Sequence, residues 1–276
     1  MEDITHSENE MNKAKALITG ASSGIGAEFA RQLAAKGYDL ILVARRRERL
    51  EHLAAEIQSK RRAAIDIQPV DLSILSEIQK LERLIGETED LEVLVNNAGF
   101  GIPGTFLDTD VDAIMTMVRV HVEASVRLTH AALPAMIARD TGFIIQVSSI
   151  SSFNAATGSP AYAATKAYLN AFTDGLATQL FDTNIKAQAL CPGFTRTEFH
   201  DSPEYQKMHI QDRLPAFFWM DAEDVVRLSL QALQHGSGIY VPGFGNKLLA
   251  FLGTSGLTRL AIRLYQAIFH RATISS

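Results

Sequence analysis

A tyrosine and a lysine stand one helical turn apart in the segment that runs from Tyr162 to Lys166. On a helix this spacing places both side chains on the same face. A phenol ionises near pH ~10, and an ammonium held beside it favours the phenolate, so the phenol can serve as a general acid and base. Such pairs also arise by chance on exposed helices, so proton transfer is a hypothesis that needs support from other residues.

Two hydroxyls, Ser148 and Ser149, follow an apolar strand predicted over residues 143–147. Ligands of open α/β sheets bind at the carboxyl ends of the strands, so either hydroxyl is a candidate to contact a substrate oxygen. Successive residues of a strand point to opposite faces. One of the two hydroxyls is therefore expected to face the ligand side of the strand, and the other to be buried in the structure.

A glycine-rich turn from Thr19 to Gly26 follows the first apolar strand, residues 14–19. Glycines let a backbone turn sharply and approach a pyrophosphate, and the next helix offers free N–H groups and the positive end of its dipole. Many strand-to-helix turns contain glycines without binding a ligand. Because this turn is the first of the chain and lies in a βαβ unit, it favours a dinucleotide site.

The residues at the end of the second predicted strand indicate which dinucleotide the site binds. Residues 39–44 lead into three arginines, Arg45, Arg46 and Arg47. A fold that selects NAD places an acidic residue here, whereas a guanidinium binds a 2′-phosphate through charge-assisted hydrogen bonds. We expect NADP(H), with Arg45 bound to the 2′-phosphate, while Arg46 and Arg47 also fit the solvated start of a helix.

Apolar strands alternate with helical patterns along the chain, and the strands are continuously apolar, as expected when helices cover both faces of a sheet. Strands are predicted at residues 14–19, 39–44, 65–70, 91–95, 143–147 and 238–241, with one more ending at Leu190. Long helices are predicted at residues 111–139 and 161–181. These elements predict one α/β domain, a Rossmann-type doubly wound parallel sheet of about seven strands with helices on both faces.

Composition narrows the class of protein. The 276 residues carry a net charge of −5, which argues against a nucleic-acid partner, because such proteins usually show a basic footprint. A single cysteine, Cys191, allows no internal disulfide, and no cluster of cysteine and histidine has the spacing of a metal site. We expect a cytoplasmic protein without a metal, with a flexible polar tail at residues 1–12 and one domain over residues 13–276.

Taken together, these motifs resemble the short-chain dehydrogenase/reductase family. Their order and spacing match over about residues 13–245. The matching segments are the turn from Thr19 to Gly26, the run from Asn96 to Gly99, Ser149, Tyr162 with Lys166, and Pro192 with Gly193. The resemblance implies an NADP-dependent oxidoreductase that reduces a ketone or aldehyde, or oxidises the corresponding alcohol.

The resemblance also implies a role for each residue. Tyr162 is the general acid/base, Lys166 lowers the tyrosine pKa and holds the nicotinamide ribose, and Ser149 binds the substrate oxygen. The thirteen-residue offset to Tyr162 favours Ser149 in this role, and Ser148 is then expected to be a buried structural hydroxyl. The residues expected to border the cofactor, besides Arg45, Tyr162 and Lys166, are Gly20, Ser22, Ser23, Ile25, Asp71, Leu72, Asn97, Ala98, Gly99, Pro192, Gly193, Thr195 and Thr197.

One position departs from the family pattern. Many members carry an asparagine in the long helix before the serine strand, where it maintains a water-linked proton relay, and this chain has His121. One interpretation is a tolerated substitution whose backbone carbonyl still binds the relay water. A second is that the imidazole, which titrates near pH ~6.5, takes part in proton delivery as a catalytic residue. A third is weaker catalysis, so the alternative function is a cofactor-binding regulatory protein with weak or no turnover.

The substrate side is less defined. Residues 194–220 resemble the family's lid, and their aromatic residues suggest an apolar substrate or simply pack the lid onto the domain. Residues 248–272 form a predicted helical extension with an apolar face and basic residues, which suits either contact with a membrane surface or packing on the domain itself. The resemblance further implies a homodimer or homotetramer built through the helices at residues 111–139 and 161–181.

Overall fold

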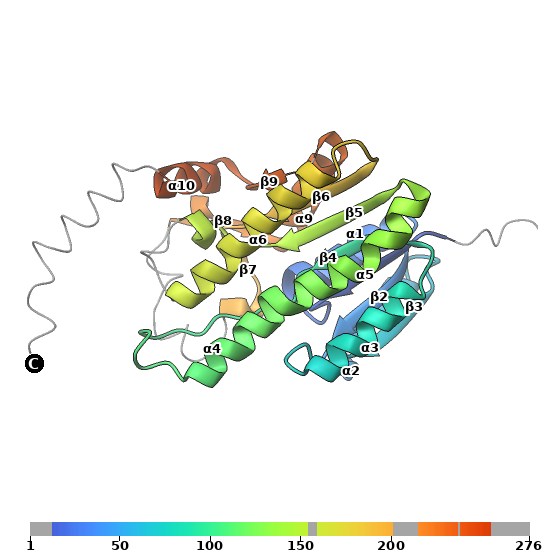
Figure 1. Cartoon of the computed structure of the whole chain (residues 1–276), viewed down its shortest axis with the longest axis horizontal. Helices are drawn as coiled ribbons and strands as arrows, with labels where there is room; N and C mark the ends of the chain where they lie inside the picture. Colours follow the sequence, from blue (N-terminus) through green and yellow to red (C-terminus); the bar gives the residue numbers. More distant parts are fainter. Residues whose placement is uncertain (1–12, 154–158, 201–214, 237, 255–276) are drawn as a thin grey trace, which may run out of the picture.

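The computed structural model describes residues 13–153, 159–200, 215–236 and 238–254. Seven parallel strands form one sheet in the order β3-β2-β1-β4-β5-β6-β9 (Figure 1). Their bounds are Lys15–Thr19 (β1), Asp39–Ala44 (β2), Ile65–Pro69 (β3), Leu91–Asn96 (β4), Gly142–Val147 (β5), Ile185–Leu190 (β6) and Gly238–Tyr240 (β9). The predicted fold class and number of strands are confirmed.

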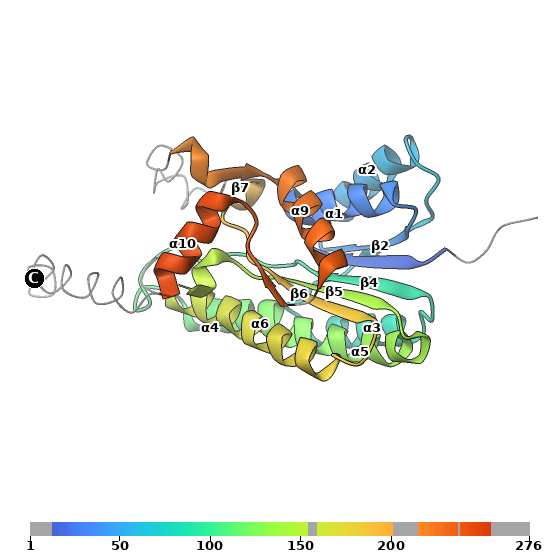
Figure 2. The same cartoon turned by 90° about the horizontal axis from the view of Figure 1, so that it is seen from above.

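Helices cover both faces of the sheet (Figure 2). On one face lie Gly24–Ala35 (α1), Arg47–Gln58 (α2) and Ala222–His235 (α9). On the other lie Leu75–Gly86 (α3), Val111–Val118 (α4), Ala124–Arg139 (α5) and Pro160–Gln179 (α6). Each face has its own apolar core, because the strands between them carry buried apolar side chains on both sides.

The strand order reverses between β1 and β4, which pair in parallel although α1 and two complete βα units, β2–α2 and β3–α3, separate them in the sequence. Ligands of doubly wound sheets bind in the crevice outside the carboxyl ends of the strands at such a switch point. The glycine-rich turn follows β1, and the run from Asn97 to Gly99 follows β4, so both meet at this crevice.

The long helix predicted over residues 111–139 is divided in the structure. Between α4 and α5, residues Arg119–Glu123 (η1) form one turn of π-helix. A π-turn accommodates one extra residue within a helix and is frequently found at functional sites. His121 lies in the middle of this turn, where its side chain is directed into the protein and is 1% exposed.

The substrate-side segment contains a second, small sheet of two parallel strands, Phe194–Arg196 (β7) and Trp219–Asp221 (β8). Short 3-10 turns at Ile150–Phe153 (η2), Glu198–His200 (η3) and Ala216–Phe218 (η4) and the helix Phe244–Thr254 (α10) complete the described elements. The predicted tail at residues 1–12, part of the predicted lid (201–214) and most of the predicted C-terminal extension (255–276) lie outside the described residues. Within the described part, no helix is both long and apolar enough to cross a membrane.

Candidate functional site

The glycine-rich turn is fastened to the loop after β4 by side-chain hydrogen bonds. The Thr19 hydroxyl accepts from the backbone N–H groups of Asn97, at 2.9 Å, and Ala98, at 3.0 Å. The Asn97 amide donates to the carbonyl oxygens of Thr19, at 2.9 Å, and Gly20, at 3.3 Å. Asn97 and Ala98 therefore hold the two loops at the switch point together, in addition to bordering the crevice.

Glycine is required at two positions of the turn. Gly20 has φ +65°, and a Cβ there would lie 2.8 Å from the Asn97 amide nitrogen and 2.9 Å from the Ala98 Cα. A Cβ on Gly26 would lie 2.3 Å from the Gly20 carbonyl oxygen. The turn thus packs closely against the loop after β4 and against itself, and it leads into the N-terminus of α1, where backbone N–H groups can bind an anion.

An arginine from the end of β2 binds the side chains of this turn. The Arg46 guanidinium donates to the Ser22 hydroxyl at 2.9 Å and to the Ser23 hydroxyl at 3.1 Å. Arg45, the residue that the sequence favoured for the 2′-phosphate, has an exposed side chain one position before. Ile25 packs partly buried against the core. Of the three arginines after β2, Arg46 is therefore the one that the structure brings to the glycine-rich turn.

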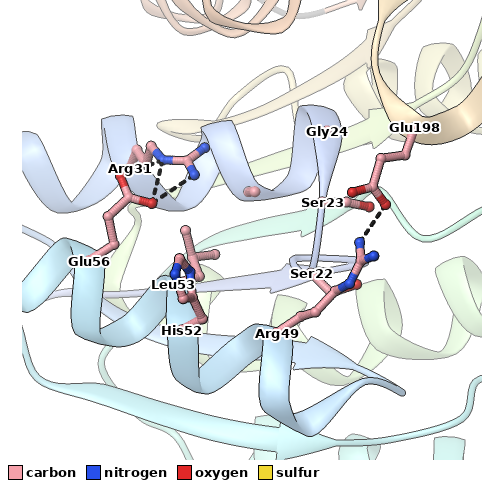
Figure 3. A pocket seen from close by; sticks show the side chains of 10 residues that line it. Ser22, Ser23, Gly24, Arg31, Arg49, His52, Leu53, Glu56 and Glu198 are labelled. Carbon is pink, nitrogen blue, oxygen red and sulfur yellow. Dashed lines mark hydrogen bonds and ion pairs between the residues drawn. The ribbon is translucent and has the colours of Figure 1, made fainter.

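A pocket of about 360 Å³ opens between α1 and α2 beside this turn (Figure 3). Ser22, Ser23 and Gly24 line its inner end, and Arg49 and Glu198 form an ion pair across it. At its far end Arg31 of α1 binds Glu56 of α2 at 2.8 Å (Figure 3), and this pair lowers the pKa of Glu56. Sequence reasoning did not single out Arg49 or Glu198.

The end of β5 is joined directly to α6. The Lys166 ammonium donates to the Val147 carbonyl oxygen at 2.8 Å, and the Ser148 hydroxyl donates to the Lys166 carbonyl oxygen at 2.8 Å. Ser148 is 2% exposed, so the structure places it as the buried structural hydroxyl. Ser149 is only partly buried, and its hydroxyl oxygen accepts the Ser151 N–H at 3.1 Å.

Tyr162 and Lys166 lie on adjacent turns of α6. Pro160 occupies the first turn and the Ser159 side chain caps the helix by accepting the Tyr162 N–H, which fixes the start of the helix at the tyrosine. The ammonium lies 5.7 Å from the centroid of the Tyr162 ring. Burial lowers the pKa of Lys166 to about 8. The structure therefore brings a half-buried phenol and a buried ammonium together at the carboxyl end of β5.

His121 makes a hydrogen bond through each ring nitrogen. Its Nε2 accepts the Phe100 N–H at 3.0 Å, so this nitrogen carries no proton. Its Nδ1 lies 2.9 Å from the Thr165 hydroxyl oxygen, and that hydroxyl donates to the Tyr162 carbonyl oxygen at 2.8 Å. The neutral ring with its proton on Nδ1 satisfies all three groups.

Burial and the nearby Lys166 ammonium hold the pKa of His121 well below its usual value. The imidazole packs edge-on against the rings of Phe100 and Tyr162, with centroids 5.9 Å and 5.7 Å away. Gly99 permits this arrangement, because a Cβ there would lie 2.8 Å from His121 Nε2 and 3.4 Å from Lys166 Nζ. His121 thus connects the loop after β4 to the first turns of α6.

The segment after β6 lies between the glycine-rich turn and α10. Thr195 is buried and donates to the Gly193 carbonyl oxygen at 3.1 Å. A Cβ on Gly24 would lie 3.1 Å from the Thr197 Cβ, so Thr197 lies against the glycine-rich turn. Pro192 is buried, and a Cβ on Gly193 would lie 2.0 Å from Asn246 Oδ1 of α10.

Asn246 is a residue that sequence reasoning missed. It is 2% exposed, it donates to the Pro242 carbonyl oxygen at 3.2 Å, and its Oδ1 has no hydrogen-bond partner within the described residues. Asn246 is marked out by its burial and its contact with Gly193, which are features of the structure and not of the sequence.

The two residues expected near the adenine differ in position. Asp71 is half-buried, and its carboxylate accepts the Ser73 N–H at 2.9 Å. Leu72 is 6% exposed and packs in the core beneath α3 and α5.

These residues fit a phosphorylated dinucleotide. The close-packed glycines, the N-terminus of α1, and the Ser22, Ser23 and Arg46 side chains supply donors to an anion at one end of the crevice. Ser149, Tyr162 and Lys166 supply hydroxyls and an ammonium at the other end.

The chain is similar to known oxidoreductases. A family model described as short chain dehydrogenase matches residues 14–207. An oxidoreductase of Staphylococcus saprophyticus, itself described as uncharacterized, is 30% identical over 233 residues, which cover 84% of this chain and 96% of the relative.

The descriptions of two further similar proteins name a cofactor. The NADP-dependent 3-hydroxy acid dehydrogenase of Schizosaccharomyces pombe is 37% identical over 187 residues, 66% of this chain and 72% of the relative. A short-chain dehydrogenase from Sphingobium yanoikuyae, solved in complex with NADPH, has a TM-score of 0.77 and 28% identity. That likeness covers 95% of this chain and 98% of the solved one.

Proposed function

This chain belongs to the short-chain dehydrogenase family of oxidoreductases, and from that premise we propose that it is an NADP(H)-dependent carbonyl reductase or alcohol dehydrogenase. The observation that carries the proposal is the junction of β5 and α6, where the buried Lys166 ammonium lies 5.7 Å from the Tyr162 ring centroid. The expected substrate is a ketone or aldehyde, or the corresponding alcohol.

The cofactor is held between the two loops at the switch point. Gly20, Ser22, Ser23 and the N-terminus of α1 bind its phosphates, and Lys166 holds its ribose near the nicotinamide. When bound, the nicotinamide supplies or accepts the hydride of the reaction.

Three side chains then handle the substrate oxygen. Tyr162 donates its phenolic proton to the carbonyl oxygen during reduction and takes a proton back during oxidation. The Lys166 ammonium stabilises the phenolate that forms. The Ser149 hydroxyl donates a hydrogen bond to the same oxygen, where negative charge develops. The bond from Lys166 to Val147 supports these roles, because it sets the distance between the ends of β5 and α6.

His121 acts in this proposal as a positioning residue. Both of its ring nitrogens are engaged, to Phe100 and to Thr165, and its pKa is held low, so the imidazole has no free position from which to carry a proton. Its bonds instead fix the loop after β4 and the turn of α6 that bears Tyr162.

The preference for NADP(H) rests on Arg46 in place of the expected Arg45. Arg46 already donates to Ser22 and Ser23 at the turn, where the adenosine ribose of a dinucleotide lies in this type of fold. Two relatives are described with NADP or NADPH, which supports the same choice.

An apolar substrate and a homo-oligomer complete the proposal. Phe199 lies 6.2 Å from the Tyr162 ring, measured between centroids, which gives the substrate side an aromatic wall. Met115 of α4 and Tyr168 of α6 are 54% and 44% exposed on the helices expected to pair subunits. Large exposed apolar side chains on neighbouring helices suit an interface between copies of the chain.

A turnover assay tests the function. Purified protein is mixed with NADPH or NADH and a panel of ketones and aldehydes of graded size and apolarity, and cofactor oxidation is followed by absorbance. Faster turnover with NADPH, reduced in Arg46→Ala much more than in Arg45→Ala, is the expected result. A preference for NADH, or equal effects of the two arginine variants, would contradict the assignment of Arg46.

A further inference from the structure

Glu198 occupies an unexpected position for an acidic residue. It begins η3, two residues after the end of β7 on the substrate side of the molecule, yet its carboxylate reaches the start of α2 (Figure 3). There it forms an ion pair with the Arg49 guanidinium and lies 3.5 Å from Arg46 Nη1. Hydrogen bonding to Arg49 lowers the pKa of Glu198, so the carboxylate is charged at neutral pH.

Arg46 is shared between this carboxylate and the glycine-rich turn. The same guanidinium that lies near Glu198 donates to the Ser22 and Ser23 hydroxyls. Two arginines and two hydroxyls therefore converge on one point at the mouth of the pocket, and the only carboxylate among the residues described there that pairs with either Arg46 or Arg49 is Glu198. The other ion pair in the pocket joins Arg31 to Glu56, whose further partners are Glu28 and Lys60, so this group does not involve Arg46 or Arg49.

We propose that Glu198 competes with the 2′-phosphate of NADP(H) for Arg46 and Arg49, and thereby sets how strongly the chain prefers NADP(H) to NAD(H). The inference rests on the proposed function, since it assumes that the 2′-phosphate binds at Arg46. A ligand with the 2′-phosphate has to displace the carboxylate or share the two guanidinium groups with it. A ligand without this phosphate leaves the carboxylate paired.

The competition connects the two ends of the crevice. Phe199 follows Glu198 in η3, and its ring packs on that of Tyr162. Release of Glu198 by a phosphate therefore moves the short turn that bears Phe199, next to the reacting phenol. The ring of Trp219, in β8, lies 5.4 Å from that of Phe194, in β7, measured between centroids. Because Trp219 is the single tryptophan of the chain, its fluorescence reports on movement of this segment.

The test compares the binding of 2′,5′-ADP and 5′-ADP, which differ only in the phosphate at issue. Dissociation constants are measured by calorimetry for the wild type, Glu198→Gln and the control Glu51→Gln. The control removes the same charge from an ion pair with Arg47 on α2, which is not among the residues that line the pocket. Fluorescence of Trp219 is recorded in the same titrations.

Glu198→Gln is expected to bind 2′,5′-ADP about fivefold more tightly than the wild type, the size of effect expected for one half-exposed charge a few ångströms from a phosphate. The affinity of Glu198→Gln for 5′-ADP should change less than about twofold, since this nucleotide has no 2′-phosphate to bind the two arginines. The affinities of Glu51→Gln for both nucleotides should also change less than about twofold, since Glu51 pairs with Arg47. Addition of 2′,5′-ADP, and not 5′-ADP, should change the Trp219 fluorescence of the wild type.

Three results would overturn the inference. One is unchanged or weaker binding of 2′,5′-ADP by Glu198→Gln. The second is an equal gain for both nucleotides, and the third is an equal gain in Glu51→Gln, which would indicate a general effect of net charge. In each case a wild type that prefers 2′,5′-ADP leaves the proposed function standing. A wild type that binds the two nucleotides equally well removes the basis for NADP(H) at Arg46, and the inference fails together with it.

Discussion

His121 provides a sharp test of the site, because the structure requires its imidazole to stay neutral. The ring is 1% exposed, accepts the Phe100 N–H at Nε2, and lies near the Lys166 ammonium. Protonation would place a second buried cation beside the first and would leave the Phe100 N–H facing another donor. The folded chain therefore binds a proton here only well below the pH at which the unfolded chain does.

The sign of the effect follows from linkage. A histidine whose pKa is lowered by folding contributes its full stability above the unfolded pKa of ~6.5, and this contribution is lost as the pH falls further. Between about pH 7 and about pH 5.5 the loss amounts to about 1.2 kcal/mol for one histidine that remains neutral in the folded state. For a chain of this size that corresponds to a fall of about 3 °C in Tm.

The assay is thermal unfolding followed by circular dichroism at both pH values. The proteins compared are the wild type, His121→Asn and His130→Asn, the last of which removes an exposed histidine from α5. Wild type and His130→Asn should lose about 3 °C more on acidification than His121→Asn does. Equal losses in all three proteins would refute the neutral, doubly hydrogen-bonded imidazole. We also expect His121→Asn to retain turnover, and a large loss with a shifted pH profile would instead assign the imidazole to proton delivery.

Three further predictions concern the phenol, the loop after β4 and the subunit interface. Carbonyl reduction should decline as the pH rises through about 8, because Lys166 then loses the charge that stabilises the phenolate formed when Tyr162 donates its proton. A pH-rate profile that is flat over this range would contradict that role. Gly99→Ala should lower kcat by about tenfold or more in steady-state kinetics, since the new Cβ would clash with His121 Nε2 at 2.8 Å. An unchanged kcat would show that the site tolerates a shift of the loop after β4. Tyr168→Glu should yield a smaller assembly in size-exclusion chromatography with light scattering, because it would bury a charge in the proposed interface, where the ring of Tyr168 is 44% exposed on α6. An unchanged mass would remove α6 from the interface.

The fold could be predicted from the sequence because its determinants are local. Continuous apolar runs predicted the strands of a sheet covered on both faces; each run is found as a strand, buried in the middle of the sheet and only partly buried in the edge strands β3 and β9. The interpretation of Ser148 as a buried hydroxyl combined the alternation of side chains along a strand with the family's spacing between serine and tyrosine, and the bond from Ser148 to the Lys166 carbonyl oxygen agrees with it.

Features that depend on contacts between distant elements were missed. The helical pattern over residues 111–139 continues through η1, so the π-turn left no mark in the periodicity. The contact of Arg46 with Ser22 could not be predicted, because three consecutive arginines do not reveal the direction of each side chain at the start of α2. Glu198 lies far from both arginines in the sequence, and Asn246 reaches Gly193 only once α10 has packed.

The central claim is that Tyr162 transfers the proton while the rest of the crevice binds the cofactor. The most direct measurement compares the wild type with Tyr162→Phe for two quantities, NADPH affinity by calorimetry and NADPH oxidation with the best ketone of the panel. We predict that the variant binds NADPH within about threefold of the wild type and loses turnover by at least about a hundredfold. Turnover retained in the variant would contradict the assignment of Tyr162, and NADPH binding by the wild type without turnover on any carbonyl compound would favour a cofactor-binding regulatory protein.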